Sequence, residues 1–259
     1  MKRLAVLLAL ALAATACPRT RATVVESPTG SPRPPSVEVV AQNLRLLSDA
    51  SRPLRVGFSA AEPTVRVIVT YPDTGAIVAA CALGSADATP PNSLPEPECL
   101  SELPSGVREE LSSSSRIAGI AIWVRSGDPV TANVRVEFAE GARPRPVRFV
   151  LPLLPAPSSP SACKDNACNP LIEVKPERGG PFSARASWSG GVARLALLQG
   201  RLLAKSFTAT GLPYAIPAQQ RNANSASIEA RMSAPGEYGL VVDSNAADLT
   251  DVVIESRWP

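Results

Sequence analysis

The chain has 259 residues, of which 45% are hydrophobic and 19% are charged, so it can build packed cores and is not a disordered polypeptide. Its formal net charge is only +3, and Lys2 and Arg3 supply two of those charges, so composition does not point to nucleic-acid binding. The chain contains no histidine, which excludes serine–histidine and cysteine–histidine nucleophiles and removes the commonest metal ligand.

The amino terminus has the pattern of a secretory signal. Lys2 and Arg3 precede an apolar run over residues 4–13, and small residues then lead into Cys17. A cysteine directly after small residues resembles a bacterial lipoprotein signal. That resemblance implies cleavage before Cys17, thioether lipidation of its sulfur and acylation of the new amino terminus. The alternative is an ordinary signal peptide, cleaved at residues 14–16, that leaves Cys17 as a thiol.

The segment after Cys17 is predicted to be a tether. Residues 18–35 are rich in proline and polar side chains, which favours a semi-extended chain without a core. Arg19 and Arg21 lie beside the anchor, where they are either solvated or in contact with anionic headgroups. No later stretch approaches the ~20 apolar residues of a membrane-spanning helix, so we expect a soluble body. The predicted localisation is export to the periplasmic or surface side of a bacterial membrane, with the outer membrane favoured.

Four cysteines remain if Cys17 is lipidated. An even number in an exported, oxidising setting predicts disulfides, and neighbours in sequence suggest the pairs Cys81 with Cys99 and Cys163 with Cys168. Four cysteines nevertheless permit three connectivities. A zinc site is the competing interpretation, although the spacing is irregular and no histidine assists.

Short alternating segments separated by Gly, Pro, Asp and Ser recur from residue 36 onward, which is typical of sandwich strands. We therefore predict an all-β protein with two tandem antiparallel β-sandwich domains of the Ig-like or jelly-roll-like kind. The predicted divisions are a signal peptide (1–16), the lipidated cysteine and Pro-rich tether (17–35), a first sandwich (36–152), a linker (153–162) and a second sandwich (163–259).

The two halves show the same predicted order of strands and loops. In the first half we expect strands at 54–58, 65–71, 76–83, 107–111, 117–124 and 130–138, with a turn at 61–63, a long loop at 84–106 and an edge strand at 147–151. In the second half we expect strands at 172–174, 182–188, 192–198, 202–207, 228–232, 238–242 and 252–258, with a long loop at 208–225. The shared order indicates a tandem duplication of one unit.

The segment APGEYGLVV at residues 234–242 resembles the closing strands of bacterial pre-peptidase C-terminal β-sandwich domains. That resemblance implies an accessory, non-catalytic role beside secreted enzymes or on the cell surface. The same alternation places the tryptophans: Trp188 and Trp258 are in phase with core positions. Trp123 is out of phase with its neighbours and should face a neighbouring element or solvent.

No catalytic, metal-binding or cofactor-binding residue is predicted. Ser161 and Lys164 match a Ser-x-x-Lys pattern, but they lie in the proline-flanked linker rather than at a helix start. Asp165 and Asn166 are too few for a calcium site. Glycoside hydrolysis needs two carboxylates held across a cleft, and the close pairs available are Glu109 with Glu110, Glu96 with Glu98, and Asp248 with Asp251.

The predicted contact residues lie in the long loop at 208–225, where an aromatic side chain occurs among amides. They are Tyr214, Gln219, Arg221 and Asn222. The alternative is an ordinary ordered loop whose tyrosine packs on its own sandwich. A basic strip, Arg143, Arg145 and Arg148, would either meet anionic glycan or keep an edge strand from aggregating.

Three functional hypotheses follow. The first is a membrane-anchored cell-envelope lipoprotein that acts as a non-catalytic binding or scaffolding module for envelope protein or glycan. The second is a subunit of a larger envelope assembly or secretion machine whose edge strands pair with partner strands. The third is a carboxylate-dependent glycan hydrolase. The expected partners are the membrane, through the lipid anchor, and an envelope protein or glycan, with no nucleic acid.

Overall fold

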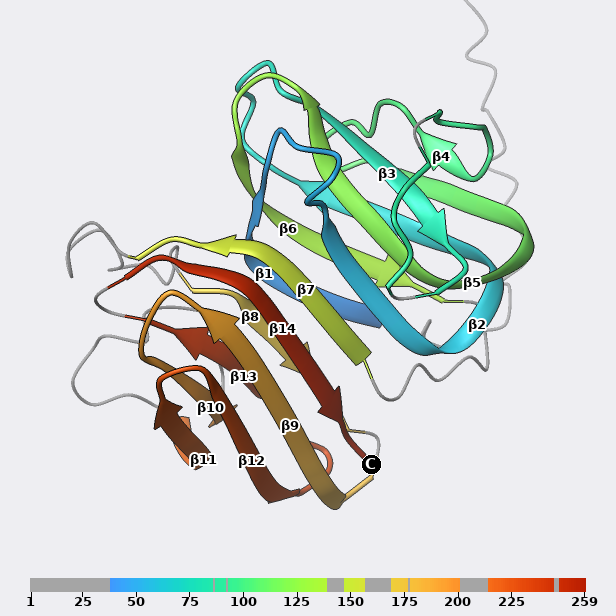
Figure 1. Ribbon diagram of the computed structural model, residues 1–259. Helices are drawn as coiled ribbons and strands as arrows, with labels where there is room; N and C mark the ends of the chain where they lie inside the picture. The colour runs from blue at the N-terminus through green and yellow to red at the C-terminus, as the bar shows by residue number, and fades with distance from the viewer. Residues whose placement is uncertain are drawn as a thin grey trace, which may run out of the picture. The chain divides into compact units, whose positions relative to one another are not determined.

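A computed structural model describes residues 38–259 except 86, 92, 139–146, 157–168, 177, 201–213 and 245–246. Within these residues all regular elements are β-strands, and every strand pair is antiparallel (Figure 1). The strands are β1 (Glu38–Leu46), β2 (Leu54–Thr70), β3 (Ile77–Leu83), β4 (Cys99–Leu100), β5 (Arg108–Ser126), β6 (Val130–Glu137), β7 (Val147–Leu154), β8 (Leu171–Val174), β9 (Gly180–Ser189), β10 (Ala193–Gly200), β11 (Tyr214–Asn222), β12 (Ser225–Met232), β13 (Tyr238–Asp243) and β14 (Leu249–Arg257). The prediction of an all-β antiparallel sandwich fold is confirmed.

The strands form two layers that meet at β2. One layer has the order β11-β10-β13-β8-β1-β6, and the other has the order β12-β9-β14-β7. β2 belongs to both, because residues 66–70 pair with β6 while residues 55–58 pair with β7. β5 pairs with both parts of β2, and β3 and β4 continue the second layer beyond β5. One buried hydrophobic cluster contains residues of both layers and both halves, including Val39, Phe149, Phe182 and Leu240.

The predicted turn at residues 61–63 is wrong, because β2 is one continuous strand. Its pairing with β5 continues on both sides of Glu62, from Gly57 opposite Gly119 to Thr64 opposite Ser112, with register shifts around Glu62. Proline is tolerated at such irregularities as well as in turns, so Pro63 did not mark a chain reversal. The predicted strands at 107–111 and 117–124 are likewise parts of one strand, β5, which pairs with both parts of β2.

The predicted edge strand at 147–151 is also wrong, because β7 is internal. It pairs with β2 on one side and with β14 on the other, so it hydrogen-bonds the two halves of the chain (Figure 1). β1 and β8 make a second junction between the halves. β7 ends at Leu154, inside the predicted linker at 153–162, and the rest of that linker from 157 lies outside the described residues.

Polar side chains reinforce the β1–β8 junction. Gln42 of β1 donates from Nε2 to Oε1 of Glu173 in β8 at 2.7 Å. Lys175 lies 3.1 Å from the same carboxylate and 3.8 Å from that of Glu38 in β1. The Gln42–Glu173 and Lys175–Glu38 contacts join side chains more than a hundred residues apart, and sequence periodicity does not indicate such pairs.

Strand β9 shows why the alternation predicted the fold well. Phe182, Ala184, Ala186 and Trp188 are buried, and the residues between them are exposed. The indole nitrogen of Trp188 donates to the carbonyls of Gly191 and Ala223, so its polar group is satisfied. Trp188 and Trp258 both belong to the large core cluster, as predicted.

The outer face of β3 and β5 is covered by the segment that contains β4. Trp123 is only 4% exposed there and packs in a separate hydrophobic cluster with Cys81 and Cys99, so its predicted outward phase is confirmed, against a neighbouring element. Cys81 and Cys99 form the predicted disulfide, with an S–S distance of 2.03 Å. The outer face over β3 and β5 is therefore apolar and covered.

Tyr71 holds the far end of the same covering segment. Its hydroxyl donates to the carbonyl of Leu103 at 2.9 Å, and its backbone N–H donates to the Ser105 hydroxyl. Burial raises the pKa of the Tyr71 phenol, and the carboxylates of Glu102 and Asp73 raise it further. The phenol is therefore kept in its neutral, donating form.

Several predictions fall on residues that the structure does not describe. They are the signal and Cys17, the tether, the pair Cys163 and Cys168, Arg143 and Arg145, Ser161 with Lys164, Asp165 with Asn166, and the strand at 202–207. The duplication also stays a prediction. No helix among the described residues is long and apolar enough to cross a bilayer.

Candidate functional site

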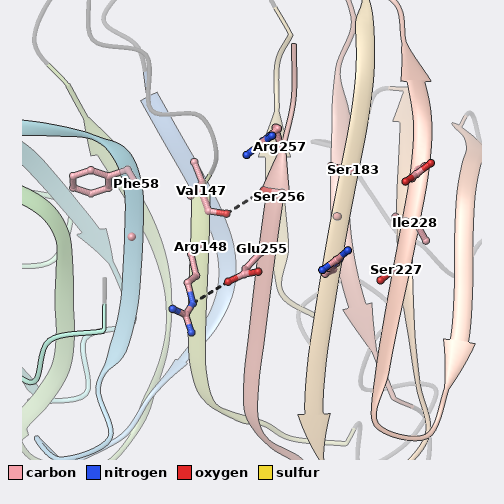
Figure 2. A pocket seen from close by; sticks show the side chains of 13 residues that line it. Phe58, Val147, Arg148, Ser183, Ser227, Ile228, Glu255, Ser256 and Arg257 are labelled. Atoms are coloured by element: carbon pink, nitrogen blue, oxygen red, sulfur yellow. Dashed lines mark hydrogen bonds and ion pairs between the residues drawn. The ribbon is translucent and has the colours of Figure 1, made fainter. Parts of the chain in front are cut away.

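A groove of about 590 Å³ lies along the outer face of the second layer, over β7, β14, β9 and β12 (Figure 2). A second hollow of about 400 Å³ is lined by some of the same residues, so the two form one continuous depression. The residues shared by both are Arg148, Arg185, Ser227 and Glu255. We call this depression the outer groove.

Strand register places the outer-groove residues in rows across the sheet. The central row runs from Ser227 of β12 through Arg185 of β9 and Glu255 of β14 to Arg148 of β7, and ends at Gly57 of β2. Neighbours in such a row have Cβ atoms roughly 5 Å apart. Five strands thus bring together residues from widely separated parts of the chain.

One end of the central row is an ion-paired network. The Arg148 guanidinium contacts the Asp87 carboxylate through Nη1, and its Nε lies 3.5 Å from Oε1 of Glu255 (Figure 2). The second contact is an ion pair without good hydrogen-bond geometry, since the buried Nε of Arg148 has no hydrogen-bond partner. The buried Nε of Arg55 likewise has no hydrogen-bond partner among the described residues. Arg148 and Glu255 therefore largely neutralise each other.

The other arginines of the outer groove have no such partner. Arg185 and Arg257 are exposed, and neither makes an ion pair or side-chain hydrogen bond with any described residue. They occupy neighbouring strands at diagonal positions, because Arg185 is opposite Glu255 and Arg257 is opposite Ser183. Two guanidinium groups thus face solvent over one part of the groove.

The remaining lining combines serine hydroxyls with apolar residues, among them Phe58, Val147 and Ile228. Ser183 and Ser187 project outward from β9, and Ser225 and Ser227 project outward from β12. Ser225 is opposite Ser187, and Ser227 is opposite Arg185. All four are exposed. The outward side chains of β9 and β12 therefore offer hydroxyl groups between charged side chains.

The predicted contact residues Tyr214, Gln219, Arg221 and Asn222 lie on strand β11, so the predicted loop is wrong over residues 214–222. Residues 208–213 lie outside the described part of the chain. β11 pairs with β10 along its length, from Tyr214 opposite Gly200 to Asn222 opposite Ala193. Its sequence is amide-rich and lacks alternating apolar residues, so periodicity could not identify it as a strand.

Two amides of β11 contact neighbouring strands, and a third, Asn222, accepts a 2.8 Å hydrogen bond from the backbone N–H of Ala223. Gln220 accepts a 2.6 Å hydrogen bond from the backbone N–H of Ser227 in β12, and Gln219 accepts one from Nη1 of Arg194 at 3.4 Å. Arg194 also forms an ion pair with Asp243, which lies opposite it on β13, the strand on the other side of β10. These amides therefore tie β11 to its neighbours, and the exposed Arg221 and Asn222 remain as contact candidates.

Four of the six carboxylates considered for hydrolysis, Glu110, Glu98, Asp248 and Asp251, have partners on other segments. Glu110 lies 3.4 Å from Arg66, and Glu98 accepts a hydrogen bond from the Ser113 hydroxyl at 2.7 Å. Asp248 accepts from the backbone N–H of Ala156 at 2.7 Å, and Asp251 is 3.9 Å from Arg52. Within the described residues no group of three metal-ligating side chains is present.

Sequence reasoning singled out Arg148 but missed the rest of the outer groove. The alternation of β9 predicts that Arg185 points outward, which was the available signal. The placement of β14 between β7 and β9 could not be read from the sequence, and this placement brings Arg257 and Glu255 beside Arg185.

Comparisons with known proteins give distant structural likenesses only. No family model and no curated protein matches the chain. Among solved structures, the N-terminal CBM22-1-CBM22-2 tandem domain of Xyn10C from Paenibacillus barcinonensis is similar at 12% identity, covering 85% of this chain and 78% of that chain, with a TM-score of 0.24. Vicilin from Solanum melongena is similar at 7% identity, covering 85% and 75%, with a TM-score of 0.19. At these TM-scores neither likeness supports a functional argument.

Proposed function

We propose that this protein is a lipid-anchored, non-catalytic binding module of the bacterial cell envelope, with the outer groove as its contact surface. The observation that carries the proposal is a pair of exposed guanidinium groups, Arg185 and Arg257, which have no ion pair with any described residue and lie in an open depression on a paired sheet. Strand pairing fixes the backbone from which these side chains project, so no backbone has to be ordered on binding.

The disulfide supports an exported location. Cys81 and Cys99 are bonded and fully buried, and such bonds persist in oxidising compartments such as the bacterial periplasm. The lipoprotein-like signal ending at Cys17 provides the route and the anchor. Three acyl chains exceed the two signals that stable membrane attachment needs.

The structural use of the carboxylates supports a non-catalytic role. Glycoside hydrolysis needs one carboxylic acid with a raised pKa and a second carboxylate facing it across the scissile bond. Glu110, Glu98, Asp248 and Asp251 instead have partners from neighbouring segments that hold the fold together. Hydrolysis of envelope glycans by the purified protein would contradict this part of the proposal.

The proposal is tested in two steps on the full chain. Replacement of Cys17 by serine should abolish labelling with a fatty-acid analogue and release the protein from membranes, because a thioether requires sulfur. The detergent-solubilised wild type should be retained by immobilised envelope fragments, and the double variant R185E/R257E should lose that retention. R116E is the matched control, since Arg116 is also an exposed strand arginine without an ion pair to any described residue.

A second candidate function is a subunit of a larger envelope assembly, and strand β11 favours it. Among the described strands β11 ends its layer, and its residues 215–222 are exposed except for the half-buried Ala218. An edge strand with free backbone groups can accept a partner strand. Crosslinking in membranes should then trap partner peptides on Arg221 and Asn222 rather than on the outer groove.

A further inference from the structure

Arg185 and Arg257, which make no ion pair with any described residue, present their guanidinium groups to acidic ligands in the outer groove. Glu255 lies opposite Arg185 in register, but its carboxylate is engaged by Arg148 at 3.5 Å. Arg257 lies opposite Ser183, which carries no charge. A guanidinium presents several N–H donors in a planar fork that matches a carboxylate. Neither Arg185 nor Arg257 has an ion-pair partner among the described residues, and Glu229 is a further charged lining residue without one.

The lining around the two arginines suits a hydroxylated ligand. Ser227 is opposite Arg185, and Ser183 lies between Glu229 and Arg257. Each serine hydroxyl both donates and accepts, and the Glu229 carboxylate accepts. Sugar hydroxyls also donate and accept, so they can pair with every one of these groups.

The same surface is unsuited to a peptide. β9 is paired with β12 and β14, and β14 is paired with β9 and β7, so the backbone groups at the centre of the face are already used. A peptide strand cannot be added there. Apart from Val253, the outward side chains that line the groove are serine, arginine and glutamate, which is unlike the apolar or aromatic anchors of protein interfaces.

We infer that the outer groove binds a polysaccharide that carries carboxylate groups. Arg185 and Arg257 pair with the carboxylates, and the serines of β9 and β12 hydrogen-bond the sugar hydroxyls. This inference rests on the proposed binding function and adds the chemical class of the ligand. Binding is expected to weaken as salt rises, because these charges are exposed and screened over ~10 Å at 0.1 M ionic strength.

The test is calorimetric titration of the full-length protein with uronate polysaccharides. Polygalacturonate, alginate and hyaluronate are the probes, and carboxyl-reduced polygalacturonate is the uncharged counterpart. At least one uronate should bind, and its reduced or neutral form should not. R185Q and R257Q should each weaken binding about fivefold or more, since each removes a charge-assisted hydrogen bond. R116Q should bind as the wild type does.

The outcomes separate this inference from the proposed function. Polyglutamate that binds as tightly as the uronates would overturn the assignment to polysaccharide. If no uronate binds while retention on envelope fragments still depends on Arg185 and Arg257, the ligand class is wrong and the binding function stands. If retention is also indifferent to these arginines, both fall. Circular dichroism of each variant confirms that it is folded.

Discussion

The second layer carries two outer faces with opposite properties. Over β3 and β5 the outward residues are apolar, among them Ala79, Cys81 and Trp123, and the segment with β4 covers them. Over β9 and β14 the outward residues are polar, among them Arg185 and Glu255, and they form an open groove. Both faces belong to one sheet of paired strands.

The difference shows that the outward-facing residues of the alternating strands determine whether a sheet face is covered or open. An apolar outward face must be covered, and its cover is fixed by a disulfide and by Tyr71. A polar outward face stays open to solvent without cost and can meet a ligand. Substitutions on the covered face should therefore change stability, and substitutions on the open face should change binding.

The largest expected effect is that of removing the side chain on which the cover packs. Trp123→Ala should lower the free energy of unfolding by about 3 to 5 kcal/mol, because Trp123 is 4% exposed and leaves a large cavity. Urea unfolding measures this. Arg185→Ala, which replaces an exposed outward residue of the open face, should change the free energy of unfolding by no more than about 0.5 kcal/mol. Equal losses in the two variants would remove the distinction between the faces.

Removing the disulfide should have the next largest effect. The double variant C81A/C99A should lose about 3 kcal/mol, because the bond closes a loop with a sequence separation of 18 and restricts the unfolded chain. Thermal unfolding of the wild type with and without reductant should reproduce most of this loss. A stable reduced form would mean that packing alone holds the cover.

A smaller effect is expected at the end of the open face. Gln220 accepts a hydrogen bond from the Ser227 N–H, so Gln220→Ala should cost about 1 kcal/mol. Gln220→Glu keeps an acceptor oxygen and should cost less, and Arg221→Ala should be nearly neutral. If Gln220→Ala and Arg221→Ala have the same effect in chemical denaturation, this contact does not stabilise β12.

The sequence predicted the parts of this comparison that depend on local alternation. The strand positions of β3, β9 and β12, the outward phase of Trp123 and the Cys81–Cys99 bond all follow from residues close together in the chain. A buried face of period two leaves a signal in any short window, and a disulfide between sequence neighbours needs no knowledge of the fold.

The pairing of distant strands could not be predicted in this way. The sequence predicts an edge strand at β7 because nothing near residue 150 indicates that β14, about a hundred residues later, lies beside it. The outer groove depends on that pairing, so the sequence indicates only Arg148 among its residues. It predicts a loop at β11 because Gln219, Gln220 and Arg221 show no apolar periodicity, although β10 provides the backbone partners of this strand.

We propose above all that the open face, rather than β11 or the covered face, is the recognition surface. The most direct measurement is a nuclear magnetic resonance titration of ¹⁵N-labelled protein with the uronate oligosaccharide that binds best. We expect the Nε–H signals of Arg185 and Arg257 and the amides of β9, β12 and β14 to shift, while the signal of Arg116 does not. Shifts confined to residues 214–222 of β11, or to the Trp123 cluster, would contradict this proposal.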